Sequence, residues 1–121
     1  MKRVLVVDDD ANLCEVLGEF LERDGYAVTM AHDGHAALEF LRQGGIDLVI
    51  LDINMPGLGG ASLVQMIRTD PEWRAVAEVP IIVVSALWDV VTFDLDVQGG
   101  FAKPVRYEQL KPKIRELIGP G

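Results

Sequence analysis

The sequence LVILDINMPG, at residues 48–57, contains an apolar run that stops at a carboxylate, Asp52, and is followed by a Pro-Gly turn. A second run of the same kind, VLVVDDD at residues 4–10, stops at Asp8 and Asp9. Short runs rich in β-branched residues are typical of strands buried on both faces, as in parallel sheets. If the two strands are parallel neighbours, the three carboxylates meet at the carboxyl edge of the sheet, where open α/β sheets place their sites.

Amphipathic segments alternate with these runs along the chain. Residues 12–23 repeat apolar side chains at helical spacing, and Asn12 with Glu15 resembles a capping box at its start. The alternation predicts an α/β fold, a doubly wound five-stranded parallel sheet with helices on both faces. The expected strands are residues 3–7, 27–31, 47–51 and 81–84 and a weak one around residue 101, and the expected helices are residues 12–23, 35–42, 61–68 and 107–118.

The composition is that of one globular domain over residues 1–121, with half of the residues hydrophobic and a formal net charge of −8. A charge of this sign disfavours direct nucleic-acid contact and anionic membranes, and favours a cation or a basic partner surface. The apolar runs are too short for a signal peptide or for membrane insertion. Because Cys14 is the only cysteine, no internal disulfide can form, and we expect a cytoplasmic location.

Polar residues close four of the predicted strands: Asp8 and Asp9, Asp52, Ser85, and Lys103. Carboxylates bind hard divalent cations such as Mg²⁺ or Mn²⁺. A carboxylate oxygen of Asp52 can also act as a nucleophile toward phosphorus. A hydroxyl and an ammonium can hold a transferred phosphoryl group. The sequence therefore predicts metal-assisted phosphoryl chemistry at this edge of the sheet.

Four motifs, in this order, resemble the receiver domain of bacterial two-component response regulators: VDDD at residues 7–10, DINMPG at 52–57, VSA at 84–86 and AKP at 102–104. The resemblance covers the whole chain and implies a flavodoxin-like, receiver-type fold. It implies that Asp52 is a phosphoacceptor, which takes a phosphoryl group from the phosphohistidine of a sensor histidine kinase or a phosphotransfer protein. Phosphorylation would then switch the interaction with a downstream protein target.

The resemblance also implies how the acidic cluster holds Mg²⁺. Asp9 and Asp52 are expected to ligate the ion directly, together with the backbone carbonyl of Asn54. Asp8 is expected to act mainly through metal-bound water. The side chain of Asn54 receives little weight, because only its carbonyl is needed.

The resemblance implies that two further residues contact the phosphoryl group. Lys103 is expected to pair with Asp52 and then with a phosphoryl oxygen, and the bond to Pro104 is expected to be cis, which X-Pro bonds allow. Ser85 is expected to swing in and hydrogen-bond the same group. Since such a domain carries out only its own phosphorylation and dephosphorylation, we do not expect a conventional enzyme.

Two features depart from the family pattern. The position three residues before the lysine usually holds an aromatic side chain, but here it is Gly100, and Phe101 follows it. Because side chains alternate along a strand, Phe101 should point toward the core. Either the strand has slipped by one residue or the usual aromatic is missing, with Trp88 as a candidate replacement. The stretch between Ser85 and Gly99 has a poor helical pattern, which predicts a shortened or irregular fourth helix.

Other functions compete with this interpretation. The chain can be a module that docks to another protein, or a receiver fragment of a longer hybrid kinase or transcription factor. The Asp-x-Asp spacing that starts at Asp8 also occurs in haloacid-dehalogenase-like phosphatases. Those enzymes generally need Thr or Val where this chain has Asn12, and they need a cap insertion that this sequence lacks. A small Asp-based phosphohydrolase is therefore the weaker alternative.

Overall fold

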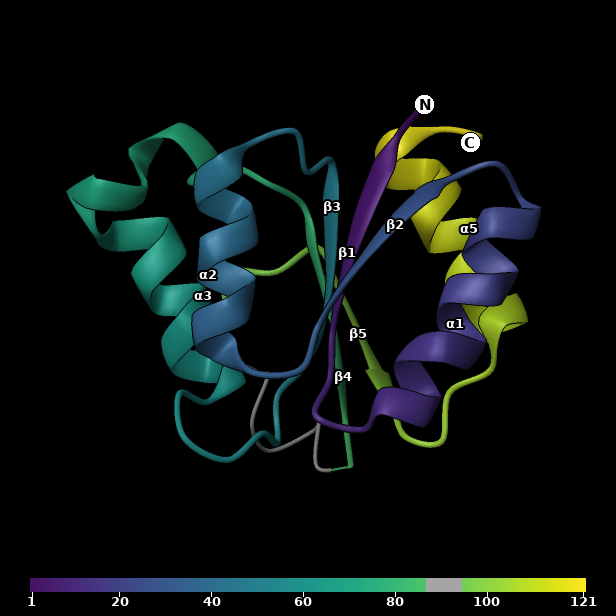
Figure 1. Cartoon of the computed structure of the whole chain (residues 1–121), viewed down its shortest axis with the longest axis horizontal. Coiled ribbons are helices and arrows are strands. Elements are labelled where there is room, and N and C mark those ends of the chain that lie inside the picture. The colour runs from purple at the N-terminus through teal and green to yellow at the C-terminus, as the bar shows by residue number, and fades with distance from the viewer. Residues whose placement is uncertain (87–94) are drawn as a thin grey trace.

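The computed structural model describes residues 1–86 and 95–121. Its elements are β1 (Arg3–Val7), α1 (Ala11–Arg23), β2 (Ala27–Ala31), α2 (Gly34–Gln43), β3 (Leu48–Asp52), α3 (Gly60–Thr69), the 3₁₀ helix η1 (Pro71–Val76), β4 (Ile81–Ser85), β5 (Gly99–Ala102) and α5 (Tyr107–Ile118). The strands form one parallel sheet in the order β2-β1-β3-β4-β5. Helices α1 and α5 cover one face and α2 and α3 the other (Figure 1), which confirms the predicted fold class.

The central strands are buried on both faces, which explains why apolar residues run through them without alternation. In β1, Leu5 and Val7 pack into the core beneath α2 and α3. Val4 and Val6 of the same strand pack into the core beneath α1 and α5. Because both sets of side chains are buried, slipping the strand by one residue would exchange the two cores, so the register is strongly fixed. This register determines which strand ends lie side by side.

The predicted bounds of β1, β2 and α5 agree with the structure, and most other bounds differ by one residue. The residue that caps the start of α1 also differs from the prediction, and the difference has a physical cause. The carboxylate of Asp10 accepts hydrogen bonds from the backbone nitrogens of Asn12 and Leu13, at 3.0 and 3.2 Å. Asp10 is therefore the N-cap residue, and the capping box predicted at Asn12 is wrong.

The last strand runs beside β4 without interruption, from the pair Ile82 and Gly99 to the pair Ser85 and Ala102. This register places Phe101 opposite Val84. Phe101 packs against the core beneath α1 and α5, as expected. Gly100 has no side chain three residues before Lys103, and a slipped strand and a missing aromatic both stay predictions. The predictions about Trp88 and the fourth helix fall mainly on residues 87–94, which lie outside the described residues.

Candidate phosphorylation and metal site

Three carboxylates meet at the carboxyl edge of the sheet. Asp8 and Asp9 follow β1 and Asp52 ends β3, and these strands pair so that Val7 lies opposite Leu51. Each of the three aspartates offers an oxygen within 4.8 Å of the others. Asp52 is 3% exposed and Asp8 is 6% exposed, whereas Asp9 is open to solvent. The convergence expected from the two apolar runs is therefore present.

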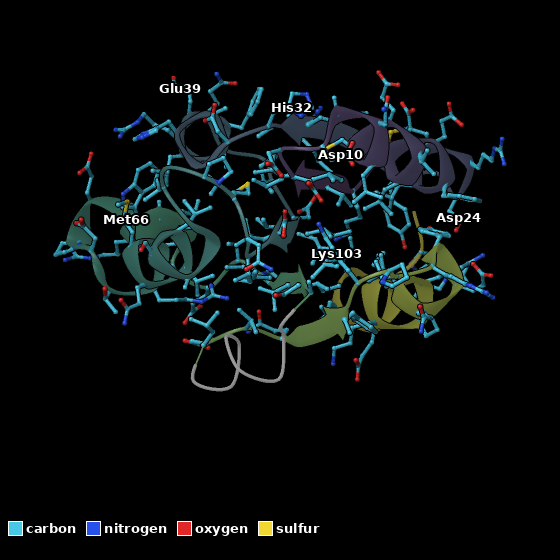
Figure 2. All side chains as sticks on the ribbon, turned by 90° about the horizontal axis from the view of Figure 1, so that it is seen from below. Asp10, Asp24, His32, Glu39, Met66 and Lys103 are labelled. Atoms are coloured by element: carbon cyan, nitrogen blue, oxygen red, sulfur yellow. The ribbon has the colours of Figure 1, made fainter. Side chains whose placement is uncertain are left out.

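Asp8 is held from several sides. Its Oδ1 accepts a hydrogen bond from the backbone nitrogen of Asp10 at 2.9 Å. Its carbonyl oxygen accepts one from the Cys14 thiol at 3.4 Å and lies 3.2 Å from Nδ1 of His32. Figure 2, which views the molecule from the carboxyl ends of the strands, shows Asp10 and His32 on the α1 side of Lys103. No pattern in the sequence connects Cys14 or His32 with this site, since only the fold brings them to Asp8.

Lys103 bridges the two buried carboxylates. Its Nζ lies 3.3 Å from Oδ2 of Asp8 and 3.3 Å from Oδ2 of Asp52. Burial by itself lowers the pKa of Lys103, but the negative charges of Asp52 and Asp8 outweigh this effect, so the pKa lies above its usual value. The peptide bond to Pro104 is cis, as expected. The ammonium is therefore fixed in its charged form beside Asp52.

The fourth strand end contributes Ser85, which is fully buried. Its carbonyl oxygen accepts a hydrogen bond from the backbone nitrogen of Lys103 at 3.0 Å. Asn54 reaches both neighbours: its backbone nitrogen donates to Oδ1 of Asp52 at 3.0 Å, and its side-chain Nδ2 donates to the Ser85 hydroxyl at 3.0 Å. This second contact was not predicted, because the family resemblance requires only the carbonyl of Asn54.

The charges of the site do not balance. Three carboxylates, those of Asp8, Asp9 and Asp52, face one ammonium, so two negative charges remain. Like charges at this range require a proton or a cation. Carboxylate and carbonyl oxygens are the ligands that Mg²⁺ prefers, and the exposed position of Asp9 leaves room for the waters that Mg²⁺ retains. The donor set therefore fits a hard divalent cation.

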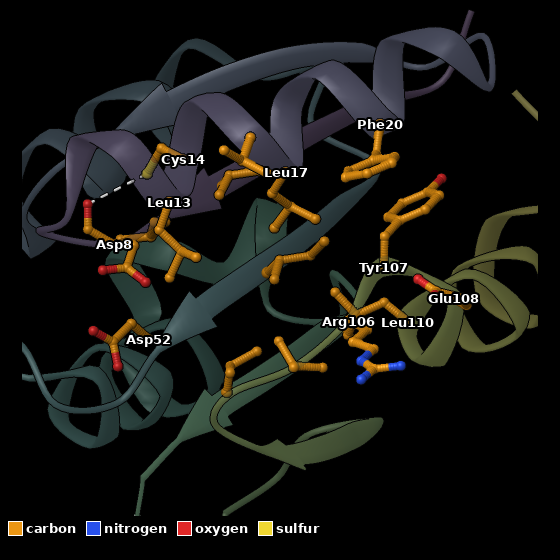
Figure 3. A pocket seen from close by; sticks show the side chains of 16 residues that line it. Asp8, Leu13, Cys14, Leu17, Phe20, Asp52, Arg106, Tyr107, Glu108 and Leu110 are labelled. Atoms are coloured by element: carbon orange, nitrogen blue, oxygen red, sulfur yellow. Dashed lines mark hydrogen bonds between the residues drawn. The ribbon is translucent and has the colours of Figure 1, made fainter.

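An apolar cavity of about 330 Å³ adjoins the acidic cluster between α1 and α5 (Figure 3). Asp8 and Asp52 lie at one end of it, and Phe20 and Tyr107 lie at the other. The rings of Phe20 and Tyr107 stack with their centroids 5.3 Å apart. On the α1 side, Leu13, Val16 and Phe20 are 37%, 53% and 39% exposed. An apolar surface thus begins next to the carboxylates.

Comparison with known proteins assigns the chain to a family. The model of the response regulator receiver domain matches residues 4–115, so the chain belongs to this family. A probable transcriptional regulator, ycf27 of Guillardia theta, is 37% identical, covering 97% of this chain and 45% of its own length. The DNA-binding response regulator MtrA of Mycobacterium tuberculosis is 34% identical, covering 97% of this chain and 50% of its own length. The chain therefore spans about half the length of these curated relatives.

Among solved structures, the response regulator TrrA of Thermotoga maritima, in complex with Mg²⁺ and BeF, is 36% identical. The two chains match with a TM-score of 0.79, over 97% of this chain and 99% of the other. The comparisons confirm the receiver fold and the place of this chain in two-component signalling. No helix within the described residues has the length and apolarity to cross a membrane.

Proposed function

We propose that Asp52 of this receiver domain accepts a phosphoryl group from the phosphohistidine of a sensor kinase or phosphotransfer protein. The observation that carries the proposal is the position of the Asp52 carboxylate, 3.3 Å from the Lys103 ammonium and within the acidic cluster. A buried nucleophile beside a fixed cation and a metal-binding group is the arrangement that phosphoryl transfer requires, because this chemistry depends mainly on positioning and charge neutralisation.

The transfer breaks one bond and forms one. A carboxylate oxygen of Asp52 attacks phosphorus, the bond from phosphorus to the donor histidine nitrogen breaks, and the electron pair stays on the imidazole. The product is an acyl phosphate on Asp52, and attack by water on phosphorus later regenerates the carboxylate and releases phosphate. Lys103, which lies beside Asp52, would stay beside the oxygens that gain charge. The Ser85 hydroxyl would donate a hydrogen bond to one of them.

The acidic cluster would hold Mg²⁺ or Mn²⁺ through the carboxylates of Asp9 and Asp52 and the carbonyl of Asn54, with Asp8 acting through water. The bound ion supplies charge stabilisation of the transferring phosphoryl group. The phosphoryl group carries about 1.5 to 2 negative charges, where the Asp52 carboxylate carried one before the transfer, and Lys103 and the ion together offset them. The domain would carry out only its own phosphorylation and dephosphorylation, so we do not propose a conventional enzyme.

The phosphodonor must bring its histidine to the edge of the sheet where Asp52 lies. The exposed side chains of Leu13, Val16 and Phe20 border the cavity that ends at Asp52, so they offer an apolar docking surface to that partner. We propose that phosphorylation then alters contact with a downstream protein, or with further domains if the chain is part of a hybrid kinase or transcription factor. The relative MtrA is described as DNA-binding, but the charge of −8 leads us to propose that these residues do not contact nucleic acid.

Incubation with acetyl phosphate and Mg²⁺, followed by intact mass measurement, tests the proposal. The wild-type protein should gain the mass of one phosphoryl group, and Asp52→Ala should gain none. The phosphohydrolase alternative predicts turnover of a generic phosphomonoester that is lost in Asp8→Asn and retained in Asp52→Asn. Such a pattern would replace the present proposal.

A further inference from the structure

Asn54 connects the two groups that face the phosphoryl position. Its backbone nitrogen donates to Oδ1 of Asp52, and its side-chain Nδ2 donates to the hydroxyl oxygen of Ser85, each at 3.0 Å. Asn54 is exposed to solvent, whereas Ser85, which accepts its hydrogen bond, is fully buried. A single residue of the loop after β3 therefore orients both the proposed acceptor and the proposed hydroxyl donor.

The backbone of Ser85 is fixed independently of Asn54. Ser85 pairs with Ala102 across the sheet, and its carbonyl accepts the hydrogen bond from Lys103. The direction of the hydroxyl group depends on its side-chain contacts, and the bond from Asn54 is one of them. An amide NH₂ can only donate, so the bond from Asn54 uses the Ser85 oxygen as an acceptor and directs the hydroxyl proton to another partner. Donation to a hydroxyl also polarises it and strengthens the bond that it donates in turn.

We infer that the Asn54 side chain is a positioning residue for phosphorylation, which orients the Ser85 hydroxyl so that its proton faces the phosphoryl group on Asp52. The inference rests on the proposed function, because it concerns the same site. It gives the Asn54 side chain a role that its backbone carbonyl does not have. It also predicts that the polarity of the side chain matters, since a carboxylate at position 54 would accept the Ser85 proton and withdraw it from the phosphoryl group.

A double-mutant cycle between positions 54 and 85 tests this inference. The rate of phosphorylation by acetyl phosphate at saturating Mg²⁺ is measured for wild type, Asn54→Ala, Asn54→Asp and Ser85→Ala, and for Asn54→Ala and Asn54→Asp in the Ser85→Ala background. A hydrogen bond to a charged group contributes about 1.5–3 kcal/mol, so Ser85→Ala should slow phosphorylation by about tenfold or more. Asn54→Ala should slow it several-fold, and Asn54→Asp should approach the loss seen in Ser85→Ala.

The phosphorylation rates of the double variants decide whether Asn54 acts through Ser85. If Asn54 acts through Ser85, Asn54→Ala should have no further effect once the hydroxyl is gone, and Asn54→Asp should keep only the effect of its charge on the metal. The added charge of Asn54→Asp acts on the metal in both backgrounds, so the cycle separates it from the effect on the hydroxyl. Urea unfolding midpoints of the single variants, measured without Mg²⁺, should stay near the wild-type value, because the Asn54 side chain is exposed.

Two results would overturn the inference. One is an equal slowing by the Asn54 substitutions in the wild-type and Ser85→Ala backgrounds, which would show that Asn54 acts independently of Ser85. The other is a wild-type rate in Asn54→Ala and Asn54→Asp. In both cases phosphorylation itself still occurs. Failure of the proposed function is distinct, because the wild-type protein would then acquire no phosphoryl group, and the inference would fall with it.

Discussion

The start of α3 lies against the backbone that follows β3: a Cβ added to Gly60 would lie 2.6 Å from the Cα of Ile53. The same Cβ would lie 2.8 Å from the carbonyl oxygen of Asp52. Both atoms belong to backbone, so the contact cannot be relieved by turning a flexible side chain. The absence of a side chain at Gly60 therefore allows the loop after β3 to close and fixes the backbone at Asp52.

Substituting Gly60 should disturb stability and phosphorylation together. We expect Gly60→Ala to lower the free energy of unfolding by about 1–3 kcal/mol, the usual cost of overpacking, and to slow phosphorylation by acetyl phosphate, since the Asp52 backbone must move. Gly59→Ala is the matched control, because a Cβ at Gly59 meets nothing within 4 Å. Equal urea unfolding midpoints for the two variants would contradict the importance of this contact.

Removal of the Lys103 charge should have opposite effects on metal binding and on stability. Lys103→Met leaves the carboxylates of Asp8 and Asp52 without their ammonium. Without Mg²⁺, the free energy of unfolding should fall by about 1–3 kcal/mol, between the values for exposed and buried pairs. The dissociation constant for Mg²⁺, measured by calorimetry, should decrease, because the cation that opposes the metal is gone.

The matched control for this charge is Lys113→Met, since Lys113 pairs with Glu116, whose side chain is 64% exposed. This variant should bind Mg²⁺ as the wild type does. Weaker Mg²⁺ binding in Lys103→Met than in the control would show that Lys103 supports the metal rather than opposing it.

Arg68 of α3 connects this helix by hydrogen bonds to residues 77–79 and to residues 96–98. Its guanidinium donates to the carbonyls of Ala77 and Val79, at 2.8 and 2.7 Å, to the carbonyl of Asp96 at 3.0 Å, and to the side chain of Gln98 at 3.1 Å. Arg68→Met would leave several of these acceptors without a donor, so we expect a loss of about 2–4 kcal/mol in urea unfolding. Glu116→Gln, which breaks only an exposed pair, should change stability by less than about 1 kcal/mol. A similarly small loss in Arg68→Met would refute the role of this arginine.

The stability should fall at alkaline pH, in part through Cys14. Burial, followed by the negative charge of Asp8, raises the pKa of the Cys14 thiol from 9.0 to about 11. Above pH 9 the unfolded chain therefore releases this proton first, so unfolding becomes more favourable between pH 9 and about 11, and no such effect exists below pH 9.

Urea midpoints at pH 8 and pH 10.5 should show this loss, and the loss should be smaller in Cys14→Ser. It should not vanish, because the pKa values of Lys103 and Tyr107 are also raised. An identical dependence on pH in the wild type and in Cys14→Ser would exclude the thiol as a cause.

The sequence was sufficient to predict the features that depend on short-range pattern. Continuous apolar runs identified the buried strands, and the carboxylates at their ends, Asp8 and Asp52, identified the edge where the site lies. Parallel pairing makes this step possible, because the carboxyl ends of neighbouring strands share one edge. The family resemblance then placed Lys103 opposite them, and the structure agrees.

Contacts between distant side chains could not be predicted in this way. The hydrogen bond from Asn54 to Ser85, the contact of His32 with the Asp8 carbonyl and the contacts of Arg68 all join residues that only the finished fold brings together. The prediction of the N-cap of α1 failed for a local reason. Several acidic and amide residues follow one another there, and each can cap a helix, so the backbone conformation determines which one does.

The central claim is that Asp52, and not Asp8 or Asp9, becomes phosphorylated. Borohydride reduction converts an aspartyl phosphate to homoserine, so the modified residue can be located by mass spectrometry of peptides after treatment with acetyl phosphate and Mg²⁺. We expect homoserine at position 52 alone, and only in samples that contained both reagents. Homoserine at position 8 or 9, with Asp52 unmodified, would contradict it.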